Sequence, residues 1–173
     1  QKEITGFGVA INISPLLELR SRYIAALAEY NTAKAKHHQS QQNINRLRNL
    51  HNAEAVSTKK LQQQKSQWLI DRARLDAAGF LINEIRNTVI LNWGNKIAEW
   101  TITPESPEIR RWVNHQQTLL HITLPSNQRS IDNVKEIYIH RSGQRNRAIP
   151  AEFISQAPYS ETISQGESFF YET

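Results

Sequence analysis

The sequence predicts an α+β fold in which a long antiparallel coiled-coil α-hairpin is followed by a small, partial antiparallel β-barrel domain. Three observations predict it. Residues 14–100 carry a heptad rhythm, residues 50–57 interrupt that rhythm, and residues 118–173 contain short alternating apolar runs. We therefore divide the chain into these two parts, a short opening segment of residues 1–13, and a connector of residues 101–117.

The hairpin has a seam that can be followed along both arms. On the first arm, seam positions recur at alternate steps of three and four from Leu16 to His51, and on the second arm from Leu61 to Val89. This rhythm keeps one stripe of a helix against a partner helix. An antiparallel reversal places Leu47 opposite Leu61 and sets large side chains opposite small ones, as dense packing requires. The matched pairs are Trp68 with Ser40, Leu75 with Ala33, Tyr30 with Ala78, and Ile82 with Ala26.

One pair in this seam is polar, because His37 falls opposite Asp71. A half-buried histidine and a carboxylate can satisfy each other through a charge-assisted hydrogen bond, whereas either group alone would be costly there. The pair has two interpretations. It fixes the register of the two helices, or it acts as a proton-sensitive latch. Both interpretations predict that the two side chains lie within hydrogen-bonding distance.

Composition limits the classes of function. The chain has 173 residues, a net charge of +5 and a pI near 9.6. Its positive residues are scattered, which favours solubility over a nucleic-acid or lipid site. The absence of cysteine excludes disulfides and thiolate metal sites, and is compatible with an extracytoplasmic compartment. Because the chain starts at Gln1 and has no methionine, we expect an internal or processed piece, with any signal peptide or membrane anchor outside it.

The ends of the two helices carry recognisable signals. Residues 1–13 contain two glycines and alternating Ile and Val, which predicts one or two short strands. Ser14 before Pro15 predicts the start of the first helix, with the serine as its cap. The second helix is expected from about Thr58 to Trp93 and beyond.

Beyond Trp93, Gly94 is expected to end or bend the second helix. Trp93, Ile97 and Trp100 are expected to form a core under the base of the hairpin. The following TITPESPE contains two prolines and predicts an extended connection.

The turn of the hairpin holds the most informative motif. Ser57 can cap the second helix, while Arg46 and Leu50 present a charge and an apolar side chain on the last turns of the first. This spacing resembles the arginine, leucine and serine signature at the hairpin tip of periplasmic adaptor subunits. These subunits, also called membrane fusion proteins, belong to tripartite efflux pumps, and the resemblance is to the resistance-nodulation-division type.

The resemblance implies a function in the periplasm. In that family the hairpins of about six copies form a tube, and the three tip residues contact an outer-membrane channel. Here those contacts would be Arg46, Leu50 and Ser57. The barrel and the hairpin base would contact an inner-membrane transporter, the exported compounds would be small molecules, and the anchor to the inner membrane would lie outside this chain.

The resemblance also concerns the two ends of the chain. In many family members the hairpin splits a lipoyl-like sandwich, but residues 1–13 and 101–117 are short for its two halves, so we expect a reduced or absent module at the hairpin base. After the connector, four runs are expected to be strands of the small barrel, separated by turns at 126–130, 142–146 and 159–167. The runs are TLLHITL, VKEIYIHR, RAIPAEFISQAP and SFFYET.

The sequence carries no recognisable catalytic, cofactor or metal motif, and we expect a protein that is not an enzyme. The six histidines lack ligand spacing, the glycines form no phosphate loop, and there is no nucleophile elbow. Two alternatives stay open. One is an adaptor for type I protein secretion, although hairpins there tend to be longer. The other is a basic cytoplasmic coiled coil that binds nucleic acid, although the chain lacks interleaved aromatic and basic residues.

Overall fold

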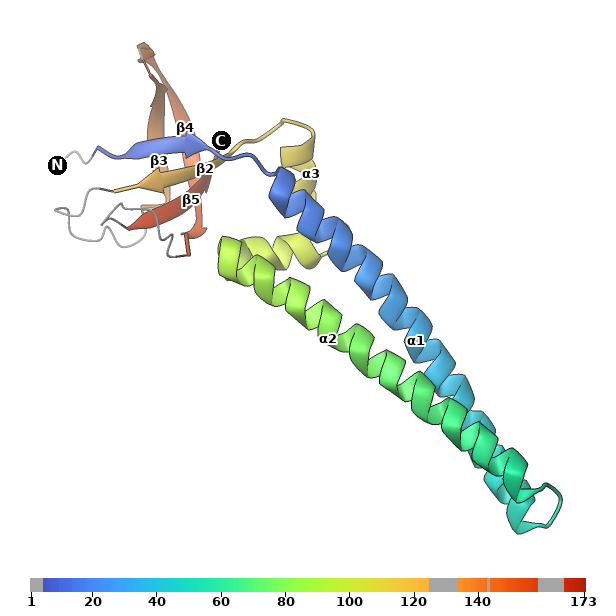
Figure 1. The fold of residues 1–173 in the computed structure, drawn as a ribbon. Coiled ribbons are helices and arrows are strands. Elements are labelled where there is room, and N and C mark those ends of the chain that lie inside the picture. The colour runs from blue at the N-terminus through green and yellow to red at the C-terminus, as the bar shows by residue number, and fades with distance from the viewer. Residues whose placement is uncertain (1–4, 125–133, 143, 159–166) are drawn as a thin grey trace. The chain divides into compact units, whose positions relative to one another are not determined.

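The computed structural model describes residues 5–124, 134–142, 144–158 and 167–173 (Figure 1). It contains a long helical hairpin and a curled, five-stranded antiparallel sheet that forms a half-barrel, which confirms the predicted fold class. The chain divides into two compact units. One unit is residues 21–86, and the other combines residues 1–20 with residues 87–173. Each unit is described by itself.

Three helices are present in the described residues. They are α1 (Ser14–Asn52), α2 (Thr58–Ile102) and α3 (Pro107–Val113). The start of α1 differs in detail from the expectation, because Ser14 is its first helical residue rather than its cap. The amide of Ser14 donates to the side-chain oxygen of Asn12 at 3.0 Å, so Asn12 supplies the acceptor expected from the serine.

Within residues 21–86, α1 and α2 pack along the predicted seam (Figure 1). Every seam position there is buried or half-buried. Two contacts between the arms agree with the predicted register to within one helical turn. The rings of His37 and Trp68 lie 6.1 Å apart, and Nε2 of His51 lies 3.1 Å from Oγ1 of Thr58. The buried seam residues are Ala26, Ala33, Ser40, Ile44, Leu47, Asp71, Ala78 and Ile85.

In the other unit, α2 bends at Gly94, as expected. Gly94 has φ 77° and ψ 169°, which are non-helical angles inside the helix. The bend presents Trp93 and Ile97 to a buried cluster, and Trp100 packs edge-on against Trp112 with ring centroids 5.7 Å apart. The predicted core of Trp93, Ile97 and Trp100 is therefore present. The cluster is completed by Leu16, Val89, Ala98, Ile109, Leu119 and Phe170.

The sheet contains five strands in the order β1-β2-β5-β4-β3, with antiparallel neighbours throughout. The four strands expected near the C-terminus are all present. Of the expected turns, residues 126–130 lie outside the described residues, as does most of 159–167, and β4 already begins at residue 144. The strands are β1 (Phe7–Ala10), β2 (Leu119–Thr123), β3 (Glu136–Arg141), β4 (Gln144–Gln156) and β5 (Ser168–Glu172).

The two faces of the sheet have different neighbours. On β5, Phe170 belongs to the helical cluster and stacks on Trp93, whereas Phe169 and Tyr171 point to the other face. This alternation follows from the two-residue period of a strand. The second face encloses a smaller core inside the curl of the sheet. Its members are Leu120, Ile122, Ala151 and Tyr171, flanked by Ile137, Ile139, Phe153 and Phe169.

Two segments at the base differ from the expectation. Strand β1 pairs with β2, with Phe7 opposite Thr123, and so belongs to the half-barrel sheet. Residues 101–108 were expected to form an extended connection, but 101–102 end α2 and 107–108 begin α3. Ser106 caps this helix and Pro107 occupies its first turn, where a proline costs no hydrogen bond. In the described part of the chain, these two segments therefore form no separate sandwich.

Candidate functional site: the hairpin tip

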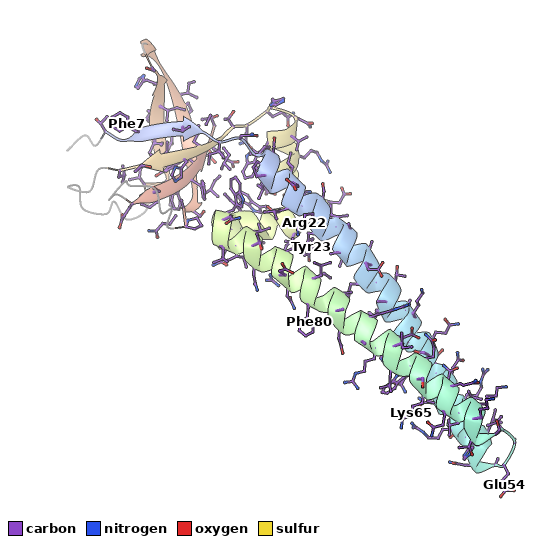
Figure 2. All side chains as sticks on the ribbon, in the orientation of Figure 1. Phe7, Arg22, Tyr23, Glu54, Lys65 and Phe80 are labelled. Atoms are coloured by element: carbon purple, nitrogen blue, oxygen red, sulfur yellow. The ribbon has the colours of Figure 1, made fainter. Side chains whose placement is uncertain are left out.

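The end of α1 is closed by its own backbone. The amide of Ala55 donates to the Leu50 carbonyl at 2.8 Å, and the amide of Glu54 donates to the His51 carbonyl at 2.9 Å. These bonds form a Schellman motif, in which the residue directly after the C-cap must adopt a left-handed backbone conformation. Glu54 fills that position with φ 57°. Its side chain lies at the end of the hairpin (Figure 2).

Ser57 begins the second arm, as the sequence predicts. Its Oγ accepts a hydrogen bond from the amide of Lys60 at 3.3 Å, and its carbonyl accepts from the amides of Lys60 and Leu61. Ser57 is therefore the N-cap of α2, and its hydroxyl remains exposed to solvent. A cap at this position fixes where the chain reverses.

Arg46 and Leu50 both face solvent on the last turns of α1. The guanidinium of Arg46 donates to Oδ1 of Asn43 at 3.4 Å, within the same helix. Leu50 keeps 39% of its surface exposed. The tip thus presents a cation, an apolar side chain and a hydroxyl to solvent. Exposed side chains of these kinds can contact another macromolecule.

One contact at the tip was missed by reasoning from the sequence. Nε2 of His51 lies 3.1 Å from Oγ1 of Thr58 and joins the end of α1 to the start of α2. The sequence did contain a signal for it, because His51 is the last seam position of the first arm. A histidine there is a polar side chain placed against the beginning of the second helix. This contact restrains the turn that carries the three tip residues.

The polar seam pair has other neighbours than expected. The buried carboxylate of Asp71 accepts a hydrogen bond from Nε2 of Gln67 at 2.9 Å, one turn earlier on the same helix. Nε2 of His37 is buried and has no hydrogen-bond partner among the described residues, and neither has Nε1 of Trp68. The hydrogen bond predicted between His37 and Asp71 is therefore absent from the structure, and the latch interpretation loses its basis.

The described residues contain no group of three histidine, aspartate or glutamate side chains placed to hold a metal ion. Among the same residues, none of the helices has an apolar stretch long enough to cross a membrane.

Comparisons with known proteins find structural neighbours only. The chain matches no protein-family model and no curated protein. One similar structure is a MacA-MexA chimeric protein that contains the Pseudomonas aeruginosa MexA α-hairpin domain. The match has 13% identity and a TM-score of 0.30, and covers 99% of this chain and 66% of the other. A second is a Bacteroides eggerthii protein named as a candidate efflux transporter, with 13% identity and a TM-score of 0.27, covering 99% and 51%. The chain thus spans less than two thirds of either neighbour.

Proposed function

We propose that this chain is the hairpin and barrel portion of a periplasmic adaptor that links an inner-membrane transporter to an outer-membrane channel in a pump for small molecules. The adaptor acts by assembly and geometry, without catalysis. Its hairpin tip docks on the channel, and its anchor to the inner membrane lies outside residues 1–173. Several copies, about six in the complete pump, form the ring.

The observation that carries the proposal is the construction of the tip. A continuous heptad seam supports both arms, and the chain reverses between a Schellman motif and the Ser57 cap. Arg46 and Leu50 remain exposed beside that reversal. A long seam that ends in a fixed, solvent-facing turn is suited to holding a small contact surface in place for a partner.

Exposed residues on α2 support the self-assembly part of the proposal. Ile70 and Phe80 keep 49% and 73% of their surfaces exposed, and Figure 2 shows Phe80 on the side of α2 that faces away from α1. With Ala73 and Ala77 they form a second stripe at steps of three and four. This is the spacing that a further helix needs for coiled-coil packing. A neighbouring copy would cover this stripe.

Site-directed crosslinking in cells tests the docking contact. The chain has no cysteine, so Leu50→Cys introduces a single reactive thiol at the tip of the complete protein. We expect crosslinks from this position to an outer-membrane channel protein. Ile24→Cys is the control, because Ile24 is an exposed aliphatic residue on the same helix, away from the tip. Equal crosslinking from both positions, or none from Leu50→Cys, would contradict tip docking.

Export assays test the role of the tip. Changing Arg46, Leu50 and Ser57 together to alanine in the complete protein should abolish export of small molecules. The matched control changes Arg22, Ile24 and Ser21, which are exposed residues of similar kinds near the base of the hairpin. Normal export by the tip variant would reject the proposal. Loss of export of a polypeptide instead would favour the type I secretion alternative.

A separate pair of variants tests self-assembly. Phe80→Asp should weaken association between copies of the complete protein, measured by sedimentation. Each single copy should still crosslink from its tip to the channel protein. Leu50→Asp should have the opposite pattern, with Ser57→Cys as the crosslinking thiol at the tip, because Leu50 lies beside the turn and outside the Ile70–Phe80 stripe.

A further inference from the structure

The distal part of the hairpin, residues 34–74, carries an excess of positive charge; we call this segment the outer hairpin. It contains nine lysines and arginines against two carboxylates, which leaves +7, whereas the whole chain carries +5. All nine cations are exposed, while one of the carboxylates, Asp71, is buried and bonded to Gln67. The cations are Lys34, Lys36, Arg46, Arg48, Lys59, Lys60, Lys65, Arg72 and Arg74.

Seven of these cations flank the seam. All seven lie within the four-residue steps of the seam: one set directly follows the seam residue that begins such a step, and the other set directly precedes the seam residue that ends it. The two sets therefore run along opposite edges of an antiparallel pair of helices. In the second set, Lys36 of α1 and Arg74 of α2 line one surface depression, together with Glu29, Thr32, Ala33 and Asp71. The first set is Lys34, Arg48, Lys65 and Arg72, and the second is Lys36, Lys60 and Arg74.

Positions that flank a coiled-coil seam commonly hold glutamate and lysine, which pair between the helices. Here the predicted register places Lys34 opposite Arg72 and Lys36 opposite Arg74. The carboxylates beside Lys36 and Arg74 are those of Glu29 and Asp71. Residues 34–74 are all described, and among their cations Arg72 forms an ion pair. Its partner is Asp76, at 4.0 Å on the exposed face of the same helix. Such a surface pair is weak, so most of the positive charge of the outer hairpin is not neutralised within the hairpin.

We propose that the outer hairpin docks lengthwise against a protein surface rich in carboxylates, which neutralises the cations along both edges of its seam. The inference rests on the proposed function and deepens it, since it extends the channel contact from the tip along the outer hairpin and gives the chemistry of the channel surface. A partner whose acidic helices lie along the two edges would place carboxylates beside both sets of cations. Charge complementarity of this kind speeds association and selects the partner.

The distribution of the cations favours an acidic protein over a nucleic acid. A duplex binds to cations gathered on one face, but these cations lie along two edges. A single strand needs exposed aromatic rings on which its bases stack. The one phenylalanine, tyrosine or tryptophan in residues 34–74 is Trp68, which is half-buried, packs against His37 and lies under the guanidinium of Arg72.

Binding of the 173-residue chain to labelled poly-L-glutamate, measured by fluorescence anisotropy over a range of salt, tests the inference. The variant changes Lys34, Lys36, Arg72 and Arg74 to glutamine. The control changes four exposed cations outside the outer hairpin, Arg22, Arg86, Lys96 and Arg110, and so removes the same net charge. We expect about tenfold weaker binding for the variant, because it loses four surface ion pairs with the probe. Binding of the control should change by less than about twofold.

A stability measurement gives a second readout that does not depend on the probe. Since the four substitutions remove repulsion, the variant should unfold at a higher temperature than wild type in low salt, whereas the control should not. Poly-L-glutamate should raise the unfolding temperature of wild type more than that of the variant. Equal loss of binding in variant and control, or tighter binding of a random DNA duplex than of poly-L-glutamate, would overturn the inference.

The two proposals can fail separately. If the complete protein with the four glutamines still crosslinks fully from Leu50→Cys to the channel, the charge inference is wrong and the docking function stands. If the wild-type background gives no crosslink at all, the docking function is wrong, and the measurements with poly-L-glutamate still decide the chemistry of the outer hairpin.

Discussion

Nη1 of Arg20 donates a hydrogen bond to the carbonyl oxygen of Thr101 at 2.6 Å. The same guanidinium also binds the carbonyls of Thr103, at 2.8 Å, and of Pro104. These oxygens lie at and just beyond the end of α2, where the carbonyls have no amide partner within the helix. The positive charge also lies where the helix dipole favours a cation. One side chain on α1 therefore completes the end of a helix some 80 residues away.

Replacing Arg20 with methionine should lower the free energy of unfolding by about 1.5–3 kcal/mol, because several carbonyls lose a charged donor while the aliphatic part of the side chain is kept. Urea denaturation followed by tryptophan fluorescence measures the change. Arg22→Met is the control and should shift stability by no more than about 0.5 kcal/mol, since Arg22 is exposed. An equal effect at both positions would show that the carbonyl contacts contribute nothing.

Two glycines in α2 should respond to alanine with opposite signs. Gly79 is helical, and a Cβ there would lie 3.7 Å from Cε2 of Tyr30, an ordinary contact. Gly79→Ala should therefore stabilise the protein by about 0.5–1 kcal/mol. Gly94 has φ 77° and ψ 169°, which other residues adopt only under strain, so Gly94→Ala should cost about 1–3 kcal/mol. Thermal unfolding of the two variants in parallel tests this prediction. Changes of the same sign in the two melting temperatures would refute the assignment of a helical Gly79 and a Gly94 of positive φ.

The tip contains a residue that is unfavourable for its backbone conformation. Glu54 has φ 57°, a left-handed conformation in which the Cβ of a non-glycine residue comes too close to the backbone carbonyl oxygen. Glu54→Gly should raise the free energy of unfolding by roughly 0.5–1 kcal/mol, because relief of that strain exceeds the added freedom of the unfolded chain. Ala53→Gly should instead destabilise, since Ala53 has no positive φ. Denaturant titration compares the two, and a loss of stability in Glu54→Gly would contradict the Schellman geometry.

His121 should make stability depend on pH. Burial lowers the pKa of His121 below its ordinary value of about 6.5, because its ring packs against Phe170 in the half-barrel sheet. Below pH 6.5 the unfolded chain takes up a proton that the folded chain resists. The contribution to stability is therefore complete above the unfolded pKa and is lost as pH falls towards the lower folded pKa.

Melting temperatures measured from pH 7.5 to pH 5 should fall less steeply for His121→Gln than for wild type. His140→Gln is the matched control, since His140 lies on β3 of the same sheet but is exposed. If His121→Gln follows the same profile as wild type, the burial of His121 contributes nothing to the acid sensitivity.

The seam of the hairpin could be predicted because its signal is local and repeated. Each heptad position is set by helix geometry alone, so a consistent rhythm such as that from Leu16 to His51 identifies both the face and the register. The Ser57 cap was predictable for the same reason, since a cap bonds to an amide three residues away. The fold class followed from these elements and from the alternating strands near the C-terminus.

Side-chain partners inside the seam could not be predicted in the same way. His37 and Asp71 were predicted to face each other, yet the carboxylate bonds to Gln67, because a residue one turn away on its own helix lies within reach without any contribution from the other arm. Position in a heptad fixes which way a Cβ points. It does not fix which of several nearby donors a carboxylate takes.

The sequence by itself determined the two long helices, their seam, the reversal at the tip and the strands near the C-terminus, since each depends on residues within a few positions of one another. Only the tertiary structure decided that β1 joins β2 in the half-barrel sheet and that Arg20 closes the end of α2. It also showed that the indole of Trp112 donates to the buried carboxylate of Glu172 at 3.0 Å. These contacts join residues far apart in the chain, and local periodicity carries no information about which distant segments meet.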